Sequence, residues 1–279
     1  MSSVNVEQRF HIRVSGRGKQ PIMFAHGYGC DQSMWRLVAP AFEANYRVIL
    51  LDLAGSGRSD PAAYDRYRHG ALLGYAEDML AIIAELELED VVFVGHSVSA
   101  MIGALATTLR PDRFDSLVMI GPSPCYINDE KYIGGFTRSD IDGLIDAVDS
   151  NYLGWASTMA PIIMGTPDRP ELVEELRNSF CRAHPEIARA FAKVTFLSDN
   201  RKDLPHVQTR SLVVQVSDDV IAPVSVGQYV HEHLPNSELA VLKTRGHCPH
   251  LSAPELTTAV IRSFLQNPRD QREERRDGE

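Results

Sequence analysis

A serine in a tight turn is the most reactive feature of this sequence. The apolar run Val91–Val94 predicts a buried strand, and the Ala- and Leu-rich stretch Ala100–Leu109 predicts a helix. Between them, Gly95-His96-Ser97-Val98-Ser99 would raise the Ser97 hydroxyl above the strand at the helix N-terminus. There the helix dipole and the free backbone amide of Val98 would face any developing negative charge. The fifth position of this turn usually holds glycine, so the serine at position 99 raises the question of local crowding.

A serine hydroxyl is a weak nucleophile until a base removes its proton, and two later segments offer that base and a carboxylate to orient it. Ser217-Asp218-Asp219 follows one expected strand, and Gly246-His247 follows the next. We predict that His247 acts as general base and then as general acid, and that Asp219 or Asp218 holds its imidazole. Ser, then Asp, then His is the chain order that α/β-hydrolases use.

Two other histidines are alternative bases. His96 adjoins the nucleophile, which makes it a candidate for the wall of a substrate pocket, while His250 lies near the start of the last helix. The run His247-Cys248-Pro249-His250 has metal-binding residue types, but no second ligand cluster accompanies it. We therefore expect neither a metal nor another cofactor.

A glycine-rich turn, His26-Gly27-Tyr28-Gly29, follows the apolar run Pro21–Ala25. It predicts the loop whose backbone amide, that of Tyr28, completes an oxyanion hole with the amide of Val98. An ordinary strand-to-helix turn is the alternative that these residues leave open.

A second Gly-x-Gly, at Gly55-Ser56-Gly57, lacks a following Gly-Lys-Ser/Thr and the dinucleotide spacing, which excludes nucleotide binding. We expect Asp52, just before it, to be a structural carboxylate of the turn.

Strands and helices alternate through most of the chain, which predicts an α/β fold with a mostly parallel sheet flanked by helices. Periodic apolar residues predict helices from Leu72 to Leu86 and from Met34 to Ala44, and Ser252-Ala253-Pro254-Glu255 predicts a capping box before the last helix.

The alternation stops from Cys125 to about Val207. Four helices are expected there, over about 138–148, 152–164, 170–182 and 185–197. Helices without an intervening strand cannot extend the sheet, so we expect a cap above it. The predicted division is a core of residues 1–124 and 208–279 with residues 125–207 inserted as the cap.

Composition describes an ordinary globular protein. The chain has 279 residues, 44% of them hydrophobic and 23% charged, and a net charge of −9. The negative charge argues against a nucleic-acid partner, and no apolar run approaches membrane-spanning length. The polar N-terminus lacks the apolar segment of a secretory signal, and the four cysteines are scattered without a Cys-x-x-Cys pair. We therefore expect reduced thiols and a cytoplasmic location.

Several segments together resemble the RsbQ group of α/β-hydrolases, bacterial positive regulators of the general stress sigma factor that are related to plant karrikin and strigolactone receptors. The likeness runs from about residue 5 to residue 266. The segments that carry it are His26-Gly27-Tyr28-Gly29-Cys30-Asp31-Gln32-Ser33, Gly95-His96-Ser97-Val98-Ser99-Ala100-Met101, Gly121-Pro122-Ser123-Pro124-Cys125-Tyr126 and Gly246-His247-Cys248-Pro249-His250.

The resemblance implies an α/β-hydrolase fold with a four-helix cap and a triad of Ser97, Asp219 and His247, because the family carboxylate lies four residues before a proline, here Pro223. Tyr28 departs from the family's usual Phe by its hydroxyl. The resemblance also implies an apolar pocket lined by Tyr28, Tyr126, Phe136, Leu144, Trp155, Met159, Ala192 and Phe196.

Three functions fit these predictions. The first is a serine hydrolase of a small apolar ester, lactone or enol ether. The second is a slow-turnover receptor for a small apolar ligand, whose cap engages a protein partner; in the RsbQ group that partner is a serine phosphatase with a PAS domain. The third, ranked lower, is a metal-free perhydrolase resembling haloperoxidases.

Overall fold

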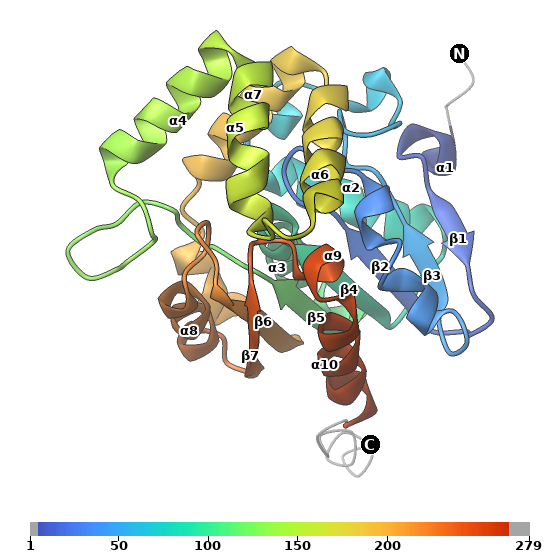
Figure 1. Cartoon of the computed structure of the whole chain (residues 1–279). Helices are drawn as coiled ribbons and strands as arrows, with labels where there is room; N and C mark the ends of the chain where they lie inside the picture. Colours follow the sequence, from blue (N-terminus) through green and yellow to red (C-terminus); the bar gives the residue numbers. More distant parts are fainter. Residues whose placement is uncertain (1–4, 268–279) are drawn as a thin grey trace.

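Seven strands form a single sheet in the computed structural model, which describes residues 5–267 (Figure 1). The strand order is β1-β3-β2-β4-β5-β6-β7. Only β1 is antiparallel to its neighbour, so the predicted mostly parallel sheet is confirmed. The strands are β1 Arg13–Ser15, β2 Pro21–Ala25, β3 Arg47–Leu50, β4 Val91–His96, β5 Phe114–Ile120, β6 Arg210–Asp218 and β7 Ser237–Arg245.

Helices cover both faces of this sheet because the side chains of each central strand alternate between two apolar layers. In β4, Phe93 packs into the layer that includes α2 and α3, whereas Val92 and Val94 pack into the layer that includes α10. The helices outside the cap are α1 Val6–Arg9, α2 Leu72–Glu85, α3 Val98–Leu109, α8 Val224–His233, α9 Pro249–Ser252 and α10 Pro254–Gln266.

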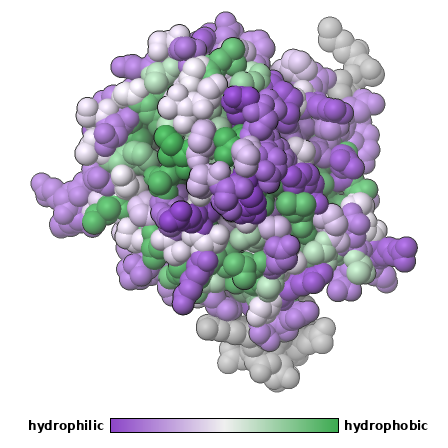
Figure 2. All heavy atoms as spheres, in the orientation of Figure 1, coloured by the Kyte–Doolittle hydropathy of each residue, from purple (hydrophilic) through white to green (hydrophobic). Residues whose placement is uncertain are grey.

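Four further helices lie between β5 and β6 in the chain. They are α4 Arg138–Ser150, α5 Tyr152–Met164, α6 Pro170–Arg182 and α7 Pro185–Phe196. Figure 1 shows them gathered on one side of the sheet, at the top of the view. The same face in Figure 2 carries apolar and polar residues interspersed over these helices. The division at residues 125 and 207 stays a prediction, and its outer ends, 1–4 and 268–279, lie outside the described residues.

Two local predictions were wrong. The helix expected from Met34 to Ala44 is two separate 3₁₀ turns, Gln32–Trp35 and Ala39–Phe42, because Pro40 cannot donate the backbone hydrogen bond that a continuous helix needs. The capping box expected at Ser252 is absent. That residue ends α9, its hydroxyl donates to the carbonyl of Arg245, and α10 begins without a side-chain cap.

Close packing of β4 against α3 makes glycine necessary at position 95. A Cβ there would overlap the carbonyl oxygen of Ser99 and lie 2.7 Å from the amide nitrogen of Ala100. We expect Gly95→Ala to lower the free energy of unfolding by about 3 kcal/mol, the cost typical of overpacking. Gly143→Ala is the matched control, because its Cβ meets nothing within 4 Å on exposed helix α4, and it should gain about 0.5–1 kcal/mol. Urea unfolding of both variants checks this; equal effects would contradict it.

Candidate active site

Ser97 occupies a strained turn between β4 and α3. Its backbone has φ 56° and ψ −123°, a region that residues with a side chain rarely adopt. Its amide donates to the carbonyl of Ile120 on the neighbouring strand at 2.8 Å. The neighbouring Ser99 is not a source of crowding, since its buried hydroxyl donates to the carbonyl of His26 at 2.5 Å. The serine that replaces the usual glycine therefore ties the turn to the loop after β2.

Ser97, His247 and Asp219 lie in one buried chain of hydrogen bonds. The Ser97 Oγ is 2.8 Å from Nε2 of His247, and Nδ1 of the same ring is 2.7 Å from Oδ2 of Asp219. Oδ1 of Asp219 accepts from the amides of Ile221 and Ala222, which fixes the carboxylate. Since an ionised carboxylate only accepts, Nδ1 of His247 carries the proton and Nε2 is free to receive one from the serine.

The alternative orienting carboxylate, Asp218, points elsewhere. It is exposed, and its Oδ2 lies 3.3 Å from Nε of Arg245 at the ends of β6 and β7. The geometry therefore leaves Asp219 in contact with the imidazole and Asp218 as a surface group.

Two backbone amides near the serine turn have no hydrogen-bond partner among residues 5–267. They are the amide of Tyr28 and that of Val98, the first residue of α3. Gly27 brings the loop after β2 against the serine turn, because a Cβ on Gly27 would lie only 3.2 Å from Cβ of Ser97. Both amides are therefore free to donate a hydrogen bond, and their role as an oxyanion hole stays a prediction.

A small cavity of about 30 Å³ lies over Ser97 and His247. Of the predicted pocket residues, it is lined by Tyr28, His96, Tyr126, Trp155 and Phe196. Burial raises the pKa of Tyr126 to about 12 despite the opposing effect of the Ser97 hydroxyl, so the phenol stays neutral. The remaining wall residues were not among the predicted pocket residues: Cys30, Ile163, Leu176, Phe180, Thr195, Ile221 and Cys248.

The other predicted pocket residues lie outside this cavity. Phe136, Leu144 and Met159 line a separate groove of about 670 Å³ along α4 and α5, which shares Trp155 with the cavity. Ala192 is fully buried in α7 and lines neither space. Leu176 and Phe180, one turn apart on α6, carried the helical spacing that could have indicated one cavity wall.

Comparison with known proteins agrees with this geometry. Residues 22–260 match the sequence model of a family described as "Alpha/beta hydrolase family". The chain belongs to the Alpha/beta hydrolase family. It is 41% identical over 264 residues to a protein of Oryza sativa subsp. japonica that is named as a probable esterase, and the match covers 94% of this chain and 97% of that protein.

Two further similar proteins align with nearly the whole length of this chain. Karrikin insensitive 2 receptor CA of Petunia hybrida is 38% identical over 257 residues, which cover 92% of this chain and 95% of that one. The solved structure of olei00960, a hydrolase from Oleispira antarctica, is 42% identical with a TM-score of 0.92 and covers 95% of this chain and 97% of its own. The expected α/β-hydrolase enzyme is thereby confirmed, whereas membership of the RsbQ group stays a prediction.

The two alternative bases, His96 and His250, form no hydrogen bond with Ser97 among the described residues. Nε2 of His96 donates to the carbonyl of His247 at 2.7 Å, and neither ring nitrogen of His250 has a hydrogen-bond partner among the described residues. His250 instead packs between Trp35 and His96, at ring-centroid distances of 4.7 and 4.4 Å. Burial lowers the pKa of both histidines, that of His250 to about 3, with neighbouring histidines adding to the effect. Both rings are therefore neutral near pH 7.

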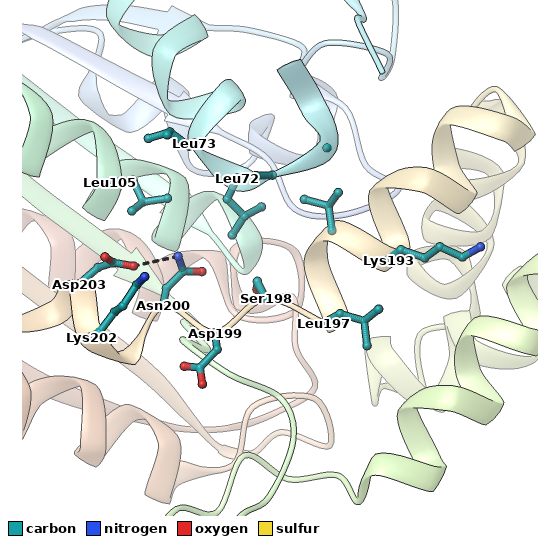
Figure 3. Close-up of a pocket in the computed structure, with 13 residues that line it drawn as sticks. Leu72, Leu73, Leu105, Lys193, Leu197, Ser198, Asp199, Asn200, Lys202 and Asp203 are labelled. Carbon is teal, nitrogen blue, oxygen red and sulfur yellow. Dashed lines mark hydrogen bonds between the residues drawn. The ribbon is translucent and has the colours of Figure 1, made fainter. Parts of the chain in front are cut away.

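A second surface hollow, of about 590 Å³, lies away from the triad (Figure 3). Leu72 and Leu105 line it together with Lys193 and Lys202, and Asn200 at its edge donates to Asp203 at 3.0 Å. No triad residue lines this hollow.

No helix within residues 5–267 combines the length and apolar character needed to cross a membrane.

The buried, neutral His250 predicts acid sensitivity. An unfolded histidine gains a proton as the pH falls through about 6.5, whereas folded His250 stays neutral to about pH 3. The free energy of unfolding should therefore decrease as the pH is lowered from about 6.5 to about 3. In His250→Phe, which keeps a ring against Trp35, we expect the pH slope of the free energy of unfolding to shrink by up to about 1.4 kcal/mol per pH unit. Urea unfolding from pH 7 to pH 4 measures it, with exposed His206→Gln as control. Parallel curves for wild type and His250→Phe would refute this.

Proposed function

We propose that the chain is a serine esterase or lactonase of the RsbQ-like group. The single observation that carries this is the buried hydrogen-bonded chain from Asp219 through His247 to the strained Ser97. In this mechanism His247 takes the proton of Ser97 as Oγ attacks the substrate carbonyl, and the amides of Tyr28 and Val98 stabilise the resulting oxyanion.

The same histidine completes the reaction. Protonated His247 donates its proton to the leaving oxygen as the carbonyl–oxygen bond breaks, which leaves an acyl ester on Ser97. A water molecule then attacks this ester and gives a proton to His247. As the bond between the acyl carbon and Oγ breaks, His247 passes this proton to Oγ, which releases the acid and restores the free serine. Asp219 stabilises the imidazolium in both halves without becoming protonated.

The cavity favours a small ligand with an apolar body and at least one oxygen beyond the scissile group. Its walls are mainly apolar, but three of the lining residues carry a buried polar atom without a hydrogen-bond partner among the described residues. These atoms are Nδ1 of His96 and two donors, the hydroxyl of Thr195 and the Nε1–H of Trp155. Because an unsatisfied buried polar group costs stability, a ligand oxygen that bonds to either donor would gain affinity.

A receptor role is the second candidate, and the similarity to a protein named as a karrikin receptor favours it. In this role the chain binds a small ligand in the cytoplasm, turns it over slowly and activates a partner. By the resemblance to the RsbQ group, that partner is a PAS-domain serine phosphatase in a sigma-factor stress response. The triad serves both roles, so its presence does not separate them.

Replacing the nucleophile tests the hydrolase. We expect Ser97→Ala to lower kcat/KM for p-nitrophenyl acetate by about 10⁴-fold or more, since a triad without its nucleophile retains only binding and oxyanion stabilisation. A fluorophosphonate should label wild type at Ser97 and leave the variant unlabelled. Ser157→Ala, on the exposed face of α5, is the control. Full activity in Ser97→Ala would remove this serine as nucleophile.

The unpartnered Thr195 hydroxyl predicts a substrate preference. p-Nitrophenyl methoxyacetate and p-nitrophenyl butyrate differ by one ether oxygen in place of a methylene. Thr195→Val keeps the shape of the side chain and removes the hydroxyl, so we expect the ratio of kcat/KM values, methoxyacetate to butyrate, to fall about fivefold. Intrinsic reactivity cancels when the ratio is compared between proteins. An unchanged ratio would show that this hydroxyl does not contact the acyl group.

A further inference from the structure

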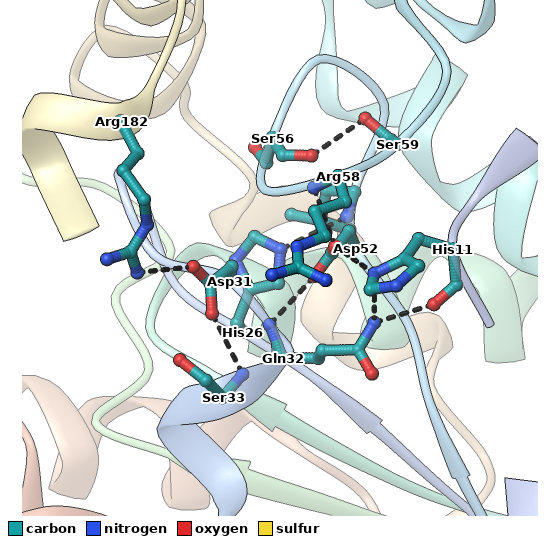
Figure 4. Close-up of polar contacts among 11 residues, drawn as sticks. His11, His26, Asp31, Gln32, Ser33, Asp52, Ser56, Arg58, Ser59 and Arg182 are labelled. Carbon is teal, nitrogen blue, oxygen red and sulfur yellow. Dashed lines mark hydrogen bonds and ion pairs between the residues drawn. The ribbon is translucent and has the colours of Figure 1, made fainter. Parts of the chain in front are cut away.

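The loop that carries the Tyr28 amide, residues 26–32, is held on one side by the core. Nε2 of His26 accepts from the amide of Leu53 at 3.1 Å, which places the ring proton on Nδ1, where it donates to the carbonyl of Gly27 at 2.9 Å. At the far end of the loop, the amide of Gln32 donates to Asp52 at 2.8 Å (Figure 4). Asp52 is thus a structural carboxylate, as the sequence indicated, and it supports the loop.

The middle of the same loop is held by the cap. Oγ of Ser179 on α6 donates to the carbonyl of Gly29 at 3.0 Å, and the hydroxyl of Tyr28 donates to the carbonyl of Ala188 on α7 at 3.0 Å. Figure 4 shows Arg182 reaching from its helix to Asp31, whose Oδ2 lies 2.6 Å from the guanidinium. Burial raises the pKa of Asp31, but hydrogen bonds from Ser33 and Arg182 outweigh it, so the pKa lies below its ordinary value.

Packing reinforces these bonds. Gly29 has φ +69°, and a Cβ on it would overlap the ring of Phe180, so α6 rests directly on the loop backbone. The core contacts hold residues 26 and 32, and the ring of His26 in turn bonds to residue 27, whereas the cap contacts hold residues 28, 29 and 31. The Tyr28 amide lies between the two sets.

We propose that Ser179, Arg182 and the hydroxyl of Tyr28 are positioning residues, through which the docked cap holds the Tyr28 amide in its oxyanion-binding orientation. This inference rests on the proposed hydrolase function and names the residues that complete its oxyanion hole. When α6 and α7 lift from the loop, Tyr28, Gly29 and Asp31 lose their cap partners together, although Asp31 keeps its bond from the amide of Ser33, and the hole loses one of its two donors.

This coupling gives cap movement a chemical consequence. A cavity of about 30 Å³ has room for about one water molecule, far less than the several hundred cubic ångströms of usual ligand pockets, so an ester enters only when the cap shifts. The oxyanion hole is then incomplete during entry and complete after closure. Loss of the positioning contacts should therefore slow the chemical step and leave substrate affinity nearly unchanged.

Isosteric variants test the proposal. We expect Tyr28→Phe and Ser179→Ala each to lower kcat for p-nitrophenyl acetate about fivefold, with KM within about twofold of wild type. The double variant should approach the loss of one whole oxyanion donor, about 10²-fold. The Ki of n-butylboronic acid, whose tetrahedral adduct on Ser97 carries the oxyanion charge, should rise by the same factor as kcat/KM falls. Arg182→Gln should show a smaller loss that Arg182→Lys restores, because this ion pair is half exposed.

Matched controls separate positioning from stability. Tyr132→Phe removes a buried phenol-to-carbonyl bond to Cys125 elsewhere, and Ser157→Ala removes an exposed helix hydroxyl; both should leave kcat and the boronate Ki unchanged. Unchanged kinetics in the positioning variants would overturn the proposal, as would a rise in KM with kcat unchanged.

Hydrogen exchange gives a readout that needs no activity. Peptides covering residues 26–32 should exchange faster in Tyr28→Phe/Ser179→Ala than in wild type, and at the wild-type rate in the controls. Equal exchange in all proteins would overturn the positioning roles. A third outcome separates this proposal from the hydrolase function. If the double variant exchanges faster but the wild-type protein neither hydrolyses esters nor reacts with a fluorophosphonate, the hydrolase function is refuted and the loop contacts stand.

Discussion

The structure depends on holding one non-glycine residue, Ser97, in a left-handed backbone conformation at the end of a buried strand. Such a conformation costs about 1–3 kcal/mol and persists only where its surroundings enforce it. Here β4 is paired on both sides, the Ser97 amide bonds to Ile120 across the sheet, and the hydroxyl of Ser99 bonds to the carbonyl of His26. The strained backbone leaves Ser97 before the first residue of α3, where it lines the cavity.

Sheet order then decides which segments meet this serine. The loop after β2 lies beside it because β2 and β4 are neighbours, and the carboxylate and imidazole arrive together because β6 and β7 are neighbours. β5 lies between the β2–β4 pair and the β6–β7 pair, and the chain just after it leaves room for the side chains from both pairs to meet. A Cβ on Gly121, just after β5, would lie 3.0 Å from Cε1 of His247, so glycine at this position lets the imidazole cross to Ser97.

Local sequence patterns were sufficient to predict the sheet and most helices, because the spacing of apolar residues and the choice of turn residues act over only a few positions. The candidate triad was accessible for a similar reason, since parallel strands deliver the residues that follow them to one edge. The pocket was not accessible, because it depends on how four helices dock. Phe136, Leu144 and Met159 belong to an outer groove, and Thr195 and Phe180 were missed, although all five lie on or beside the expected cap helices. The catalytic roles themselves stay predictions.

The cap also contacts His247, the predicted base. The amide of His247 donates to the carbonyl of Ile163 on α5 at 2.8 Å, so the imidazole and the oxyanion loop are both attached to helices above the sheet. In the proposed mechanism, a cap motion that admits a ligand would therefore disturb the contacts of both the predicted base and the predicted oxyanion donor. The same connection works in reverse, because an acyl group on Ser97 that crowds the cavity would push on α5, α6 and α7. An enzyme uses this coupling to delay chemistry until the cap has closed, and a receptor uses it to convert the state of one serine into the shape of an outer surface. The difference between the two roles then lies in the lifetime of the acylated state and in what recognises the cap, and the triad geometry is common to both.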